Sequence, residues 1–344
     1  MISYESFRNK RILVTGASGL LGFTLIRTLL DSNRKEKLDL HITALVRNRE
    51  RALQRFSGYD GRKDFSLLTG DVCQAEVFEG QTWDYIVHGA SNAHPKAFAT
   101  QPVETMKANL LGTMNLLEYA VKQKSVNEVK KLLFLSSGEI YGEAAMPDEK
   151  GWREECAGLV DSMRPRACYP ESKRAAEALC VSYYQEYEIS TVVARLSYIY
   201  GEEVLADNTR ADVQFLKNAL AGEDIVMKSE GTQMRSYCYV EDAVNALILL
   251  LLKGKAGEAY NVANPASVAT IKEYATMLAD VFQVGLKMEL PDTIEKSGYS
   301  QMKKEVLNGE KLYGIGWNPR YNLNAGMEKM KRGKKHLMVS QAES

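Results

Sequence analysis

The sequence lacks a long hydrophobic run and an excess of charge of either sign, and each absence excludes a class of protein. Its longest apolar run covers residues 246–252, whereas a helix that spans a membrane needs about 20 apolar residues. Lys+Arg and Asp+Glu both number 44, so the net charge at pH 7 is zero. Nucleic-acid and membrane-surface binders usually carry a basic excess, so we expect neither kind of partner.

Cysteine is scarce and unpaired. No two cysteines have the spacing of zinc ligands, and an odd number is a poor basis for a disulfide framework, so we expect no metal site. Residues 1–5 lack the charged and then apolar pattern of a secretory signal. Free thiols are typical of the reducing cytosol, which predicts a cytoplasmic protein. The five cysteines are Cys73, Cys156, Cys168, Cys180 and Cys238.

Short strand-like runs alternate with helical patterns from residue 11 to residue 196. Such alternation predicts βαβ units and a parallel sheet that helices cover on both faces. Strands are predicted at residues 11–15, 41–46, 65–69, 85–88, 131–136 and 191–196, and helices at 20–30, 101–124 and 169–187.

The alternation breaks after residue 201, and no linker rich in Pro, Gly or Ser divides the chain. The pattern therefore predicts an α/β protein with one parallel-sheet domain and a smaller lobe built from later segments. We assign residues 1–197 to the sheet domain, to which residues 236–263 return, and residues 198–235 and 264–335 to the lobe. Further helices are predicted at 212–221, 241–253, 270–282 and 323–331, and strands at 225–228 and 236–240.

Three glycines join the first predicted strand to the first predicted helix, in the sequence TGASGLLG of residues 15–22. Gly16 permits a tight turn, Gly19 allows the backbone to approach a pyrophosphate, and Gly22 allows helix and strand to pack closely. The N-terminus of the helix offers free N–H groups to the phosphates. Because the glycines lie between a strand and a helix, they predict a dinucleotide-binding loop.

The residue after the second strand bears on the choice between NAD and NADP. An acid there would accept a hydrogen bond from the ribose 2′-hydroxyl of NAD. This chain has Arg47 instead, which can bind a 2′-phosphate, stack on adenine or point into solvent. The sequence therefore leaves the choice of dinucleotide open.

Tyr169 and Lys173 stand four residues apart in a predicted helix and so share one face of it. An ammonium near a phenol is expected to lower the pKa of the phenol, which then removes a proton from a substrate hydroxyl. Ser137 directly follows the strand at 131–136, at the carboxyl end where ligands bind to open α/β sheets. Ser137, Tyr169 and Lys173 together predict a proton-transfer set beside the dinucleotide.

The TGxxGxxG spacing and the Ser137, Tyr169 and Lys173 set resemble those of the extended short-chain dehydrogenases/reductases, and the resemblance covers nearly the whole chain. It implies a Rossmann-type doubly wound sheet that binds NAD (NADP is possible because of Arg47) and a smaller C-terminal substrate-binding lobe. It also implies a nucleotide-diphosphate sugar as substrate and a homodimer formed through residues 101–124 and 169–187. The later segments that share the resemblance are 109–113, 231–237, 260–264, 311–312 and 316–319.

The resemblance implies roles for individual residues. Gly70-Asp71-Val72 corresponds to the adenine-contacting loop, and Arg235 to the contact with the nucleotide diphosphate. The implied cofactor contacts are Gly16, Ser18, Gly19, Leu20, Gly22, Arg47, Asp71, Val72, Ala90, Tyr169 and Lys173. The implied substrate contacts are Ser91, Asn109, Ser137 and Arg235, and the implied catalytic residues are Ser137, Glu139, Tyr169 and Lys173.

Within this family the segments 165–169 and 173–174 are most similar to those of UDP-glucuronate decarboxylases, which also carry an acid at the position of Glu139. These enzymes oxidise the sugar at C4, lose CO₂ from the β-keto acid and then reduce the 4-keto intermediate. Three positions depart from their pattern: Gly138 replaces a Ser, Tyr198 replaces an Asn, and an expected late Arg is absent, with Lys303 and Lys304 as the nearest basic residues. All three positions belong to the part of the site that would bind the sugar nucleotide.

Other activities remain open on sequence. A 4-epimerase or a 4,6-dehydratase would use the same oxidation, although Gly138 cannot supply the proton that an Asp usually donates there in dehydration. An NADPH-dependent 4-ketosugar reductase would suit Arg47. A non-catalytic dinucleotide-binding regulator on the same fold is the alternative from another class, but a binder has no need of Ser137, Tyr169 and Lys173.

Overall fold

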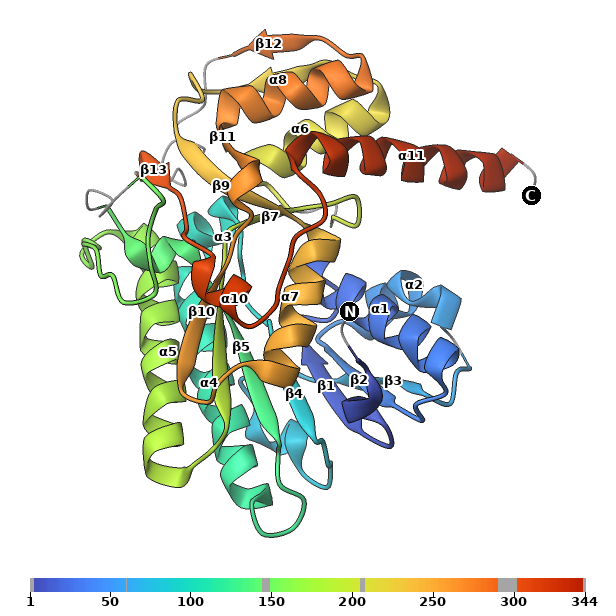
Figure 1. Cartoon of the computed structure of the whole chain (residues 1–344), viewed down its shortest axis with the longest axis vertical. Coiled ribbons are helices and arrows are strands. Elements are labelled where there is room, and N and C mark those ends of the chain that lie inside the picture. The colour runs from blue at the N-terminus through green and yellow to red at the C-terminus, as the bar shows by residue number, and fades with distance from the viewer. Residues whose placement is uncertain (1–2, 60, 144–148, 205–207, 290–301, 343–344) are drawn as a thin grey trace.

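The computed structural model describes the chain except residues 1–2, 60, 144–148, 205–207, 290–301 and 343–344. Its centre is a seven-stranded parallel sheet in the order β10-β6-β5-β4-β1-β2-β3, shown in the lower part of Figure 1. The order reverses between β1 and β4, as in a doubly wound Rossmann-type sheet. The strands are β1 (Arg11–Thr15), β2 (His41–Val46), β3 (Phe65–Thr69), β4 (Tyr85–His88), β5 (Lys131–Ser137), β6 (Thr191–Leu196) and β10 (Glu258–Val262).

Both faces of this sheet are buried, because successive side chains along each strand point to opposite sides. On β5, Leu133 and Leu135 pack in one core, whereas Leu132 and Phe134 pack in the core on the other face. Helices cover both faces, which explains why the strands are almost wholly apolar. The covering helices are α1 (Leu20–Glu36), α2 (Arg49–Arg55), α4 (Pro102–Gln123), α5 (Cys168–Tyr187) and α7 (Val240–Lys253), and the short α3 (Pro95–Thr100) packs on α4.

A smaller lobe lies above the sheet in Figure 1. In its first sheet, β9 pairs with β11, β13 and β7, and in its second sheet β8 pairs with β12. Its strands are β7 (Tyr198–Tyr200), β8 (Ile225–Met227), β9 (Met234–Tyr239), β11 (Val268–Thr270), β12 (Leu286–Met288) and β13 (Lys304–Glu305). Its helices are α6 (Ala211–Ala221), α8 (Ile271–Phe282) and α11 (Leu323–Ala342), and α10 (Glu310–Gly314) lies beside β10. Short 3-10 turns are η1 (Glu5–Phe7), η2 (Ser57–Tyr59), η3 (Ala75–Phe78), η4 (Gly138–Tyr141), η5 (Pro165–Ala167) and η6 (Pro265–Ser267).

The chain returns from the lobe to the main sheet through α7 and β10. The apolar run at 246–252 lies inside α7, and almost every side chain of this helix is buried. Such a helix packs between other elements because it has no polar face for solvent. Among the described residues, no helix is both long enough and apolar enough to cross a membrane.

The predicted α/β class and parallel sheet are confirmed, and five of the six strands predicted up to residue 196 have the observed bounds. The sixth, β5, extends one residue further, to Ser137. The strand predicted at 236–240 begins earlier, as β9, and pairs in the lobe rather than in the main sheet. Pattern analysis missed β10 and the two- and three-residue strands β7, β11, β12 and β13, which are too short to show a period.

Candidate active site

A cavity of about 1500 Å³ lies between the carboxyl ends of the main strands and the lobe. The turns that follow β1, β2, β4 and β5 line one side of it, and α6, β9 and β13 contribute to the other. This is the place where ligands bind in open α/β sheets, because the connections on the two sides of the switch point diverge there.

The glycine loop forms the floor of the cavity between β1 and α1. A Cβ atom on Gly16 would lie 2.4 Å from the carbonyl oxygen of Gly89, and the φ of Gly16 is +66°. A Cβ on Gly22 would lie 2.4 Å from the carbonyl oxygen of Gly16. Only glycine fits this close approach of loop, strand and helix. The bare backbone and the start of α1 at Leu20 fit a bound pyrophosphate.

The other residues expected to contact the cofactor also line this cavity, among them Ser18, Val72 and Ala90. Arg47 is exposed directly after β2. The Asp71 carboxylate accepts a hydrogen bond of 2.9 Å from the Cys73 N–H, which holds the turn after β3. The buried hydroxyl of Ser91 has no hydrogen-bond partner within the described chain, which leaves it available to a ligand or a water in the cavity.

Ser137, Tyr169 and Lys173 meet at the carboxyl end of β5. The Ser137 hydroxyl bonds Tyr169 and also accepts from the Glu139 N–H at 3.2 Å. The Tyr169 ring stacks on Phe98, with centroids 4.6 Å apart. The Lys173 ammonium donates to the carbonyl oxygen of Leu135 at 2.7 Å and lies 5.8 Å from the centre of the Tyr169 ring. The structure therefore brings together the three residues that the sequence predicts.

The expected lowering of the phenol pKa is wrong for the chain by itself. Burial raises the pKa of Tyr169, the charge of Glu139 raises it further, and the hydrogen bond with Ser137 only partly opposes this. Burial also lowers the pKa of Lys173 to about 7, against the smaller raising effect of Glu177. The same desolvation thus acts on both groups and disfavours both charged forms.

Two carboxylates face the cavity near this set, each beside an arginine. Glu139 forms a two-point ion pair with Arg166, with N–O distances of 2.7 and 2.9 Å. Glu305 on β13 lies beside Arg235 on β9, with 3.5 Å between Nε and Oε2. The guanidinium groups of Arg210 and Arg235 lie 4.9 and 5.4 Å from the centre of the Tyr198 ring. Arg166, Arg210 and Glu305 are cavity residues that sequence analysis does not single out.

Asn109 does not reach the cavity. It is fully buried on α4, and its amide Nδ2 donates to the Ser172 hydroxyl on α5 at 2.8 Å. The structure therefore does not bring Asn109 to the cavity wall, where a substrate contact was expected, and places this side chain in the contact between two helices. The segment 109–113, which resembles the family, thus holds α4 against α5, the helix that carries Tyr169.

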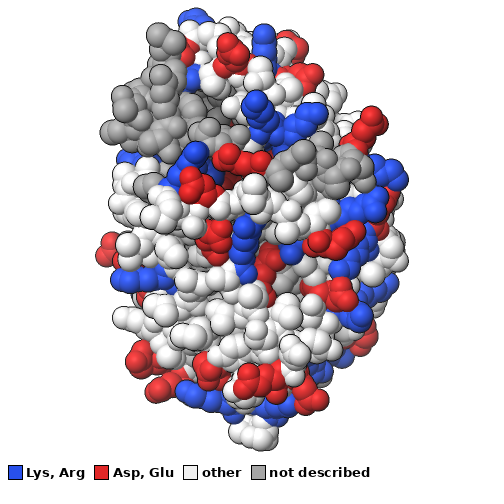
Figure 2. Space-filling model, turned by 90° about the vertical axis from the view of Figure 1, so that its left-hand side faces the viewer, with Lys and Arg blue, Asp and Glu red and all other residues white. Residues whose placement is uncertain are grey.

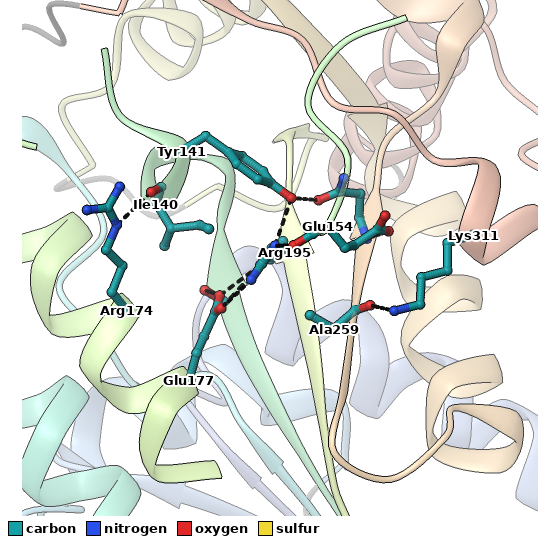
Figure 3. A network of polar contacts seen from close by, with 10 residues as sticks. Ile140, Tyr141, Glu154, Arg174, Glu177, Arg195, Ala259 and Lys311 are labelled. Carbon is teal, nitrogen blue, oxygen red and sulfur yellow. Dashed lines mark hydrogen bonds and ion pairs between the residues drawn. The ribbon is translucent and has the colours of Figure 1, made fainter. Parts of the chain in front are cut away.

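A polar network behind the cavity holds η4, the turn that carries Glu139 (Figure 3). Arg195 lies between the Glu177 carboxylate and the Tyr141 hydroxyl, at 2.8 and 3.0 Å. Arg174 on α5 donates to the carbonyl oxygen of Ile140 at 2.7 Å. These charge-assisted bonds tie η4 to α5 and β6, so that Glu139 and Tyr169 keep a fixed relation.

Removing the Lys173 ammonium is expected to stabilise the fold at low pH. The folded-state pKa of about 7 lies below the value near 10.4 of an unfolded lysine, and each unit of difference corresponds to about 1.4 kcal/mol. Between these pH values the unfolded chain binds more protons, so the stability of the parent rises with pH. Lys173→Met should therefore be more stable than the parent at pH 6, with the advantage shrinking as the pH rises from 7 to 10.

Urea unfolding of both proteins across this pH range measures the difference in the free energy of unfolding. Lys253→Met, at the end of α7, is the control and should show no such trend, because Lys253 is exposed. An advantage of Lys173→Met that does not change with pH would contradict the depressed pKa.

The doubly wound sheet, with the glycine loop and the Tyr169 cluster on either side of its switch point, defines the class of protein: an NAD-dependent enzyme of Rossmann type. Within the described ranges, no group of three or more His, Cys, Asp or Glu residues is placed to hold a metal ion.

Comparison with known proteins identifies the family. Residues 12–263 match the NAD dependent epimerase/dehydratase family, and the chain belongs to this family. It is 31% identical over 321 residues to UDP-glucuronic acid decarboxylase 1 of Xenopus tropicalis, covering 93% of this chain and 71% of that protein.

Solved structures show the same fold at lower identity. A dTDP-glucose 4,6-dehydratase from Streptomyces venezuelae with NAD bound has a TM-score of 0.79 at 22% identity, covering 95% of this chain and 97% of that one. A UDP-glucuronic acid 4-epimerase from Bacillus cereus, in complex with UDP-glucuronic acid and NAD, has a TM-score of 0.76 at 20% identity, covering 95% and 99%.

Proposed function

We propose that this protein oxidises a nucleotide-linked sugar at C4, and that the sugar is the glucuronate of UDP-glucuronate, which then loses CO₂. The observation that carries the proposal is the convergence of Ser137, Tyr169 and Lys173 at the end of β5, across the cavity from the glycine loop. The glycine loop at Gly16, Gly19 and Gly22 would hold NAD, which would supply hydride transfer from C4 and back.

The side chains of this cluster divide the proton transfers among them. The Ser137 hydroxyl is placed to bond the reacting oxygen at C4, next to the phenol of Tyr169, which removes its proton. Lys173 lies one turn further along α5 and shares a proton readily, because burial brings its pKa to about 7. Its bond to Leu135 anchors the ammonium against β5.

The same first step prepares the loss of CO₂. A ketone at C4 makes the carboxylate at C6 part of a β-keto acid, and the electrons of the broken bond delocalise onto the ketone oxygen. The two-point pair between Arg166 and Glu139 keeps a cation near the place where this charge develops. The similarity to UDP-glucuronic acid decarboxylases over 93% of the chain supports this choice.

We assign the binding of the nucleotide diphosphate to the lobe formed by residues 198–235 and 264–335, apart from the undescribed residues within it. Arg210 and Arg235 lie on the cavity wall, each with its guanidinium group near the Tyr198 ring. Arginine suits a diphosphate because its planar group donates two parallel hydrogen bonds. Arg47 lies at the other end, beside the glycine loop, where the adenosine of the dinucleotide would lie.

Product masses test the proposed reaction. The purified protein, with NAD added, is incubated separately with UDP-glucuronate, UDP-glucose and dTDP-glucose. We expect UDP-glucuronate alone to react, with a loss in mass equal to CO₂ and without net consumption of NAD. Loss of water from a glucose nucleotide would instead identify a dehydratase, and a new sugar of unchanged mass an epimerase; either result overturns decarboxylation.

We also propose a homodimer through α4 and α5. These two helices pack side by side at the edge of the molecule, and Figure 2 shows a mostly uncharged patch below the middle of this side, with charged side chains along its bottom rim. A pair of copies would bury these side chains in a four-helix contact. Sedimentation that gives the mass of a single chain at micromolar concentration would contradict this. The exposed apolar side chains are Val103, Met106, Leu111 and Met114 on α4 and Val181, Tyr184 and Tyr187 on α5.

The state of the cysteines supports a cytoplasmic location. All five are free, and Cys168, Cys180 and Cys238 are buried. Burial raises the pKa of Cys168 to about 11, which keeps the thiol protonated and unreactive. We therefore assign the protein to a reducing compartment; its recovery outside the cytoplasmic fraction of its cell would contradict this.

A further inference from the structure

Glu305 is a buried carboxyl group that the reaction described above does not use. It lies on β13, whose parallel pairing with β9 sets Glu305 opposite Arg235. Glu305 is only 2% exposed, yet it lines the cavity. Burying an acid costs free energy unless the acid is paired. A buried acid at the wall of a ligand cavity is therefore a candidate for a functional group.

Gly138 makes room for this carboxyl group. A Cβ atom at position 138 would lie 2.6 Å from Oε1 of Glu305, so any larger residue would displace it. Gly138 directly follows Ser137, and the charge of Glu305 acts on the pKa of Tyr169. Glu305 therefore faces the end of the cavity where the sugar reacts, although it lies in a different strand and far away in the sequence.

The two carboxyl groups at this end differ in environment. Glu139 accepts two hydrogen bonds from Arg166, which occupy both of its carboxylate oxygens. Glu305 has only a 3.5 Å approach to Arg235, and its Oε2 has no hydrogen-bond partner in the described part of the chain. Burial raises the pKa of Glu305 to about 7, and Arg235 lowers it less than burial raises it. Two acids with such different surroundings can act as one base and one acid.

We propose that Glu305 is the acid that donates a proton to C5 of the sugar after CO₂ has left. The bond between C5 and C6 breaks, its electron pair passes to C5 and the C4 ketone, and CO₂ departs. The proton of the Glu305 carboxyl group then moves to C5, which restores the ketone and leaves a Glu305 carboxylate that solvent reprotonates. This role rests on the proposed function, because it needs a C4 ketone.

The geometry separates this role from that of Tyr169. Tyr169 and Ser137 hydrogen-bond each other and serve the oxygen at C4, whereas Glu305 approaches from the lobe, over η4. Glu139 cannot be the donor while Arg166 holds both of its oxygens. A neutral acid at position 305 also avoids the repulsion of the substrate carboxylate that an ionised Glu305 would cause.

Glu305→Gln tests the proposal, because it keeps the size of the side chain and a partner for Arg235 but removes the acidic proton. Two rates are measured with UDP-glucuronate: reduction of the bound nicotinamide, which reports C4 oxidation, and formation of the UDP-pentose. We expect nicotinamide reduction at the parent rate and pentose formation at least about 10²-fold slower, as for loss of a general acid. Glu310→Gln, an exposed change on α10, should match the parent in both.

A second pair of variants separates chemistry from folding. Glu305→Ala removes the acid, and combining it with Gly138→Asp returns a carboxyl group to the same space from η4. We expect the double variant to recover pentose formation over the single one. Equal slowing of both rates in Glu305→Gln, or an unchanged pentose rate, overturns the proposal. A parent that oxidises no UDP-glucuronate, or releases no CO₂ from it, refutes the proposed function itself and the role of Glu305 with it.

Discussion

Tyr169→Phe is expected to lower turnover by at least about 10²-fold, the effect of removing a general acid or base. The phenylalanine ring keeps the stacking on Phe98 and loses only the hydroxyl group that bonds Ser137. The fold should be unaffected, because the ring rather than the hydroxyl supplies the buried apolar surface.

The measurement is the rate of product formation at saturating UDP-glucuronate, together with the affinity for NAD. We expect NAD to bind with affinity close to that of the parent, since the hydroxyl group acts on the sugar. Tyr187→Phe makes the same chemical change on an exposed residue of the same helix and should leave the rate unchanged. Turnover of Tyr169→Phe within a few-fold of the parent would remove Tyr169 from the catalytic set.

Gly16→Ala is expected to abolish measurable NAD binding, with an affinity at least about 100-fold weaker. The added methyl group would lie 2.4 Å from the carbonyl oxygen of Gly89, and the φ of +66° is itself strained for alanine. The loop must therefore move away from β4. Such a shift costs more than the roughly 2.8 kcal/mol that corresponds to 100-fold in affinity.

Calorimetric titration with NAD measures the loss of affinity, and urea unfolding shows whether the chain still folds. Gly58→Ala is the matched control, because a Cβ there meets nothing within 4 Å and the residue is exposed. A folded Gly16→Ala protein that binds NAD like the parent would show that the dinucleotide does not lie over this loop.

Much of the sheet domain could be predicted because its signals are local. Strands such as β1 and β6 are short apolar runs bounded by polar or turn residues, so their ends are visible in the sequence. The glycine loop and the Tyr169–Lys173 spacing are also local, since they depend on a turn and on one turn of helix. The lobe was less predictable, because β13 covers only two residues and exists through its pairing with β9.

The electrostatics of the cavity could not be predicted from spacing. A lysine one helical turn from a tyrosine suggests an acidic phenol, but burial of both groups moves their pKa values the other way. Arg166 lies three residues before Tyr169, inside the segment 165–169 that resembles the family, so the sequence does carry a signal for it. Glu305 offered no such signal, because neither its neighbours nor its spacing relate it to Gly138.

The sequence by itself determined the six strands up to residue 196, the glycine loop and the Tyr169–Lys173 pair, because each of these depends on residues within a few positions of one another. Only the tertiary structure decided which charged side chains lie close to one another. The pairing of β13 with β9 places Glu305 beside Arg235 and over Gly138, and the packing of α5 on β5 buries Lys173. Desolvation and charge contacts depend on what surrounds a group in space, and segments far apart in the chain supply those surroundings here.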